Sequence, residues 1–197
     1  EDVPEWLAYR VMNFLHHLLA GDWSAEHSVE DALLEQGLHY GRLWEVTNAL
    51  NLEGLKRAYQ GDFPGARERI ERLGKLADQY QHALAASAGQ FLTALLHLER
   101  RELREAIAAL DHYADEHPEA AFRISALGHR AAAEWLRGDA DRAEATLERA
   151  VTSGAQHVAG SCADIIEHRA ALWTFVDEPH VERALRELFG REFRHGA

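Results

Sequence analysis

Acidic, imidazole and thiol side chains gather near the end of this sequence, with the types and spacing that metal binding or nucleophilic catalysis would need. Asp164, Glu167 and His168 could share one face of a helix, and carboxylate and imidazole groups are common ligands of transition metals. Cys162 has His157 and His168 nearby in the sequence, as a thiol nucleophile and its base would require. Such clusters also arise by chance in a chain with 33 acidic residues and 13 histidines. We therefore predict a solvated polar face and a structural thiol here, with no metal, no cofactor and no catalytic residue, so that the protein is not an enzyme.

The composition limits the partners that this chain can bind. It has 21 basic and 33 acidic residues, a net charge of −12, and would be repelled by nucleic-acid phosphates and anionic lipid. No apolar run reaches the length of about 18 residues that could span a bilayer, and the single cysteine fits a reducing compartment. We expect a cytoplasmic protein, and we expect this segment of it to bind neither nucleic acid nor membrane. A pH-dependent role for the histidines stays open.

A pair of residues recurs along the chain at intervals of about 37 to 40 residues, each time after an apolar helical stretch. Glycine just beyond a helix can adopt the left-handed conformation that ends it, and a following aspartate can cap the next helix. Each pair therefore predicts a short turn between two helices. The five pairs are Gly21-Asp22, Gly61-Asp62, Arg101-Glu102, Gly138-Asp139 and Val176-Asp177.

Helical periodicity flanks these junctions. Residues five, nine and twelve positions after a junction, such as Ala66, Ile70 and Leu73, lie on one helical face and are mostly apolar. Small residues such as Gly54 and Ala94 precede the junctions, where neighbouring helices must approach closely. No segment has the alternation of a strand. We predict ten antiparallel helices, over residues 4–20, 25–37, 41–60, 64–80, 82–100, 103–116, 119–137, 140–153, 156–175 and 179–190.

The stretch from Leu52 to Ala66 resembles the tetratricopeptide repeat (TPR) family, with Gly61, Phe63 and Ala66 at the positions of the family's turn glycine, aromatic and small residue. The units are longer than the family's usual repeat of about 34 residues, and in this they resemble repeat regions of bacterial multidomain signalling ATPases, cyclases and transcription activators. The resemblance implies an all-α fold, a right-handed α-solenoid of about five helix-turn-helix repeats. We expect one such domain over residues 1–190 and a frayed tail or linker over residues 191–197.

The resemblance also implies that the first helix of each repeat lines a concave groove. The groove would be mostly apolar, which suits an amphipathic helix or an apolar peptide. The same residues could instead pack in the core, form a homodimer interface or seat a neighbouring domain. The predicted groove residues are Asn51, Leu55, Tyr59, Phe91, Leu95, Leu98, Trp135, Ile166 and Trp173.

We therefore expect a non-catalytic scaffold that binds a protein or peptide segment. The sequence begins Glu-Asp-Val-Pro without an initiator methionine, and we expect it to be the sensing or adaptor region of a larger cytoplasmic bacterial signalling or regulatory protein. The alternative is a small-molecule sensor domain that encloses an apolar ligand in the concave groove.

Overall fold

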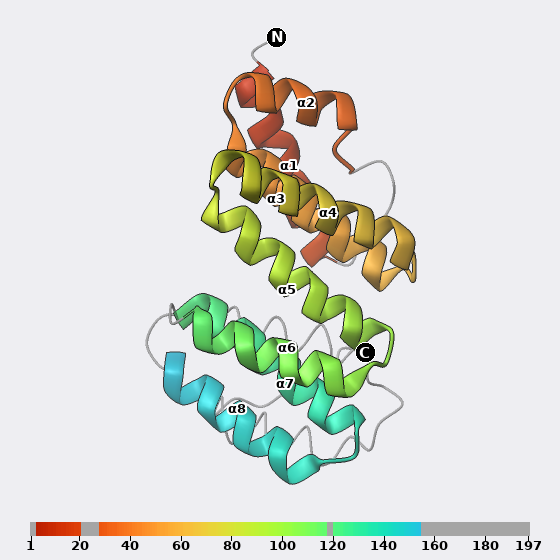
Figure 1. Ribbon diagram of the computed structural model, residues 1–197, viewed down its shortest axis with the longest axis vertical. Coiled ribbons are helices and arrows are strands. Elements are labelled where there is room, and N and C mark those ends of the chain that lie inside the picture. The colour runs from red at the N-terminus through yellow and green to blue at the C-terminus, as the bar shows by residue number, and fades with distance from the viewer. Residues whose placement is uncertain (1–2, 21–27, 118–119, 155–197) are drawn as a thin grey trace. The chain divides into compact units, whose positions relative to one another are not determined.

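The computed structural model describes residues 3–20, 28–117 and 120–154, and every regular element in these segments is an α-helix (Figure 1). No described helix is long and apolar enough to cross a membrane. The helices are α1 (Val3–Leu19), α2 (Asp31–His39), α3 (Leu43–Tyr59), α4 (Phe63–Tyr80), α5 (Ala83–Glu99), α6 (Leu103–Glu116), α7 (Ala120–Leu136) and α8 (Ala140–Gly154).

The all-helical prediction is confirmed for these residues, and seven of the predicted helices begin and end within about two residues of the observed ones, the usual uncertainty of helix ends. The exception is α2, which was expected over residues 25–37 but begins at Asp31, with Glu30 as its N-cap. The predicted helices at 156–175 and 179–190 lie outside the described residues, as do the junctions at Gly21 and Val176.

Three of the predicted junctions form the same hydrogen-bonded turn. Gly61 has a φ of +79°, its N–H donates to Ala58 O at 3.1 Å, and the N–H of Asp62 donates to Arg57 O at 2.8 Å. This pair of bonds is the Schellman motif, which satisfies the last carbonyls of a helix. Gly138 and Arg101 make the equivalent bonds, with φ values of +87° and +63°.

A fourth turn of this kind lies between the predicted helices at 25–37 and 41–60, outside the series of five junctions. Gly41 has a φ of +68°, and the N–H of Arg42 donates to Gly37 O at 2.9 Å. This turn joins α2 to α3, whereas the predicted junctions join the two helices within each expected repeat. Glycine therefore ends helices both within an expected repeat, as at Gly61, and between two expected repeats, as at Gly41.

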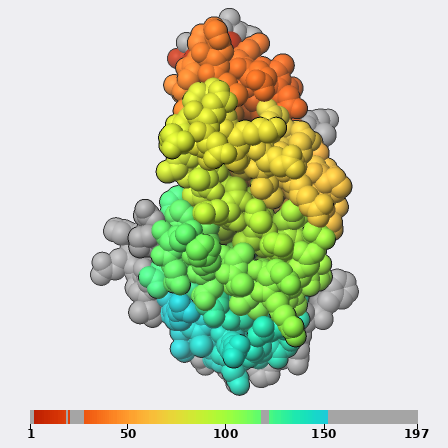
Figure 2. All heavy atoms as spheres, viewed as in Figure 1, coloured from red at the N-terminus to blue at the C-terminus, as the bar shows by residue number. Residues whose placement is uncertain are grey.

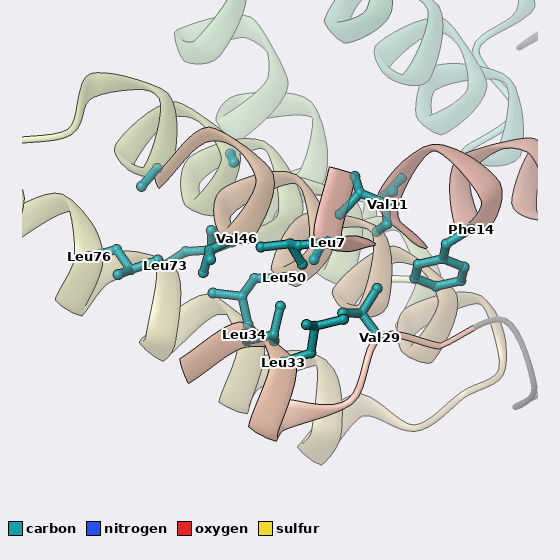
Figure 3. Packing of buried hydrophobic residues seen from close by; sticks show 14 of the residues in the cluster. Leu7, Val11, Phe14, Val29, Leu33, Leu34, Val46, Leu50, Leu73 and Leu76 are labelled. Carbon is teal, nitrogen blue, oxygen red and sulfur yellow. The ribbon is translucent and has the colours of Figure 1, made fainter. Parts of the chain in front are cut away.

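The chain divides into two compact units, residues 1–102 and residues 103–197. This division does not test the prediction of a single domain over residues 1–190. In the first unit α3 contacts α1, α2, α4 and α5, and Figure 2 shows side chains filling the space between α2, α3 and α4. The core of this unit takes residues from each of its five helices, among them Leu7, Val11, Phe14, Leu34, Val46, Leu50, Leu73 and Leu92 (Figure 3).

The second unit packs α7 against both α6 and α8. Its buried side chains include Leu110 of α6 and Leu127 of α7. Glu134 of α7 is also buried, accepting a hydrogen bond from Thr146 Oγ1 of α8 at 2.7 Å and one from Arg130 Nε at 3.1 Å. A buried carboxylate needs such partners, and the bond from Thr146 joins α7 to α8.

Candidate partner-binding surface

The packing of α3 leaves one of its sides open. A Cβ atom added at Gly54 would meet Leu92 of α5 and Arg69 of α4, so this side of α3 is closely packed. Lys56 lies about a quarter of the way around α3 from its open side and reaches over the ring of Phe14 in α1, 5.6 Å from the centroid. The side between these contacts bears a row of residues spaced by four, three, four and four positions, which follows one line along a helix. We call this row the α3 strip: Trp44, Asn48, Asn51, Leu55 and Tyr59.

The α3 strip is uncharged and partly open to solvent. Trp44 is 51% exposed, and the other four side chains are half-buried. Asn48 Nδ2 donates to the carbonyl of Trp44 at 2.8 Å, which fixes one amide along the row. The exposed tryptophan can bury apolar area on contact, and the neighbouring amide oxygens can accept hydrogen bonds. The strip contains no carboxylate, amine, imidazole or thiol.

Two oxygen atoms in this region have unused hydrogen-bonding capacity. Asn51 Oδ1 and Thr47 Oγ1 are buried without a hydrogen-bond partner, and the two residues are one helical turn apart. Buried polar atoms are normally paired because leaving one unpaired costs about 1–3 kcal/mol. Thr47 is only 1% exposed, so a partner cannot reach its hydroxyl, whereas the half-buried Asn51 amide could offer its oxygen to a donor from another molecule.

Charged groups of the first unit lie away from the strip. Asp31 of α2 is held by Arg69 Nη1 at 2.9 Å and by Arg72, both of α4. Burial alone would raise the pKa of Asp31, but these hydrogen bonds and charges outweigh it and lower the pKa. At the end of α5 a hydrogen bond from His97 lowers the pKa of Glu102. These contacts join elements of the fold to one another, and none of them involves a residue of the α3 strip.

The structure brings together some of the predicted groove residues. Asn51, Leu55 and Tyr59 share the α3 strip, although Leu55 also packs against the core. Phe91 of α5 and Trp135 of α7 are half-buried, in different units. Ile166 and Trp173 lie outside the described residues.

Leu95 and Leu98 of α5 belong to the core instead of an open surface. Their side chains are 0% and 1% exposed, so a partner cannot reach them in this structure. A leucine on a first helix is equally suited to a groove and to a core. The alternative that the sequence left open, core packing, therefore describes these two positions.

Two residues of the surface were not predicted. Trp44 and Asn48 stand seven and three positions before Asn51 and so lie on the same helical face. The expected positions began ten residues before the junction, which excluded the first two turns of α3. Extending the same period toward the start of the helix would have found both residues.

The residues that the sequence suggested for metal binding or nucleophilic catalysis cannot be placed in this structure. Asp164, Glu167, His168, Cys162 and His157 lie outside the described residues. Within the described ranges no group of three or more His, Cys, Asp or Glu side chains could hold a metal ion.

Comparisons of this chain with protein-family models, with curated proteins and with solved structures found no match.

Proposed function

We propose that this protein is a non-catalytic scaffold that binds a protein or peptide segment along the α3 strip. The observation that supports this most directly is the row of uncharged side chains headed by Trp44, which is 51% exposed in the middle of a unit with a well-formed core. Exposed tryptophans dominate many binding interfaces because they bury a large apolar area on contact.

An amphipathic helix is the partner that fits the strip best. The strip repeats every three or four residues, and a helix laid along it would present apolar side chains at the same interval. Trp44 would supply apolar contact at one end, and rotation of the half-buried Asn51 amide would present its unpaired oxygen to a donor near the middle. The net charge of −12 disfavours an acidic partner.

We further propose that the helices form a right-handed TPR-like α-solenoid of about five repeats. The supporting observations are the Schellman turns at three of the predicted junctions and the position of α3 between α1 and α5. A repeat array offers binding residues at fixed intervals. We propose that this one serves as the sensing or adaptor region of a larger cytoplasmic signalling protein.

The test selects partners without assuming their sequence. A library of 18-residue amphipathic helical peptides with uncharged polar faces, of a length that spans about five turns, is selected on the whole protein, and labelled peptides are titrated by fluorescence anisotropy. Trp44→Ala should weaken the selected peptides by roughly tenfold or more. Asn51→Ala should weaken those that donate a hydrogen bond. Tyr80→Ala removes an aromatic ring that is 40% exposed at the end of α4 and should leave binding unchanged.

The outcomes separate the candidate functions. Circular dichroism should give equal helical content for all variants, since Trp44 and Tyr80 are exposed. If the selected peptides bind the Trp44→Ala variant with the same affinity as the native protein, the α3 strip is not the site. If no peptide is selected but a small apolar dye binds saturably and depends on Trp44, the small-molecule sensor alternative is favoured.

A further inference from the structure

The solvent side of α1 is unusual for an outer helix of this protein. Its exposed residues are Glu5, Trp6, Tyr9, Met12 and His16, and Trp6, Tyr9 and Met12 are 43%, 58% and 54% exposed. The rings of Trp6 and Tyr9 stack with their centroids 5.5 Å apart. We call these five residues the α1 face. By contrast, the exposed residues of α4 are mainly charged, including Arg67, Glu68, Glu71, Lys75 and Asp78.

The exposure of the α1 face does not come from a helix that has failed to dock. Leu7, Val11 and Phe14 on the opposite side of α1 are all buried in the core of the first unit (Figure 3). The helix therefore has two apolar sides, one of which is covered within the chain. A helix that is apolar on both sides normally contacts something on both.

The order of residues on the α1 face identifies what would cover it. Glu5, Tyr9, Met12 and His16 are spaced by four, three and four positions, the spacing of a seam between two paired helices. This spacing is the same when read in either direction. We propose that the α1 face pairs with a second copy of this chain, the two α1 helices running antiparallel about a twofold axis that passes between Arg10 and Val11.

Antiparallel pairing matches four of the five exposed groups, all except Trp6, with a chemically suitable one. Tyr9 of one copy lies against Met12 of the other, and thioether–aromatic contacts are favourable. Glu5 of one copy lies against His16 of the other, so that an imidazole N–H can donate to a carboxylate. About a twofold axis each of these contacts occurs twice, because residue i of one copy meets residue j of the other and the reverse.

Charge also favours a second copy at this face over other surfaces of the chain. With a net charge of −12, two copies repel each other through most of their surfaces. The α1 face has one carboxylate, Glu5, and the Arg10 guanidinium lies over the Trp6 ring, 5.8 Å from its centroid, so the face lacks the negative charge of the chain as a whole. Antiparallel pairing keeps the two Glu5 side chains at opposite ends of the interface, which minimises their repulsion.

The contact should be weak and concentration-dependent. One helix face buries less than the roughly 800 Å² per partner of a standard stable interface. We therefore expect a dimer that dissociates in the micromolar range. Sedimentation velocity of the whole protein from about 5 to about 500 µM, a range centred on that affinity, should show monomer converting to dimer.

Variants of the α1 face test its part in the dimer. Met12→Glu places a carboxylate against Tyr9 of the other copy and should abolish dimerisation, with helical content unchanged because the side chain is exposed. Tyr9→Gln should weaken the dimer in the same way and serves if Met12→Glu folds poorly. Tyr80→Glu, at an exposed tyrosine of α4, should dimerise normally. A native protein that stays monomeric throughout, or a dimer that both α1 variants leave intact, would overturn the proposal.

A charge-pair experiment tests the antiparallel register itself. Tyr9→Lys and Met12→Glu should each be monomeric alone. Mixed together, they should form a heterodimer, because position 9 of one copy faces position 12 of the other and joins a lysine to a glutamate. In a parallel pairing the same positions face each other, so mixing removes the like-charge contacts but joins no lysine to a glutamate, and the mixed dimer should be weaker than the native one. Dimerisation by either variant alone, or none in the mixture, would therefore contradict the proposed arrangement.

Discussion

Replacing Gly54 with alanine should destabilise the first unit although alanine is the better helix former. A Cβ atom at this position would overlap Leu92 Cδ2, and it would lie 3.3 Å from Leu92 Cγ and 3.4 Å from Arg69 Cβ. Leu92 is fully buried and cannot move aside without disturbing the core. Overpacking a core by one methyl group costs about 1–3 kcal/mol, and the helix propensity of alanine returns about 1 kcal/mol. The net loss in the free energy of unfolding should be between about 0 and 2 kcal/mol.

Gly74 supplies a matched control because it lies inside α4 of the same unit with no atom within 4 Å of an added Cβ. Gly74→Ala should therefore raise stability by about 0.5–1 kcal/mol. Urea unfolding followed by circular dichroism gives both values, and their difference isolates the packing term because helix propensity is common to the two changes. A Gly54→Ala protein that gains as much stability as Gly74→Ala would refute the close approach of α3 and α5. The loss of unfolding free energy caused by Leu92→Ala should be smaller by about 1 kcal/mol in the Gly54→Ala protein than in the native one, because the shorter side chain makes room for the added methyl group.

Two further predictions concern polar groups that join helices. Hydrogen bonds from Arg72 and Arg69 overcome the effect of burial and lower the pKa of Asp31, so the ionised carboxylate stabilises the fold above its unfolded pKa, and this contribution is lost as pH falls through the lower folded pKa. Asp31→Asn should thus have a lower urea midpoint than the native protein at neutral pH, and the two midpoints should converge by about pH 2; a constant difference would contradict this. Thr146→Val removes the 2.7 Å bond to buried Glu134 and should cost about 1–3 kcal/mol in urea unfolding at neutral pH. Thr146→Ser keeps the hydroxyl and should cost clearly less; equal losses would assign the effect to packing instead.

The positions of the helices could be predicted because their ends depend on local chemistry. A Schellman turn needs a residue with positive φ, and glycine at positions 61 and 138 reveals it directly. Gly41 makes the same turn but falls halfway between two junctions, so a search for a forty-residue interval passes over it. Arg101 adopts a φ of +63° without being glycine, and only its place in the repeat identified it. The late start of α2 had a local signal in the capping-box spacing of Ser28 and Asp31, although the observed N-cap is Glu30, which makes no side-chain capping bond.

The candidate surface was only partly predictable because exposure depends on which neighbours cover a helix. Helical period alone placed Asn51, Leu55 and Tyr59 on one face of α3. The same rule applied to α5 selected Leu95 and Leu98, which are buried. Leu95 stands at the position of half-buried Leu55, so their difference in exposure arises from packing between elements, which no local pattern records. Leu98 stands at the position of Ala58, and both are buried.

The charges of α3 give the strongest reason to regard the α3 strip as a contact surface. Glu45, Glu53 and Lys56 are all buried, because neighbours on several sides of α3 enclose most of its circumference. Long charged side chains can accept this when their ends reach partners, as Lys56 Nζ reaches Ser28 Oγ at 2.6 Å. Meanwhile Trp44 faces solvent. A helix that buries its charges and exposes a tryptophan reverses the usual arrangement, which disfavours an isolated monomer surface. The reversal becomes favourable once another molecule covers the tryptophan, so binding supplies a physical reason for it that the free chain lacks.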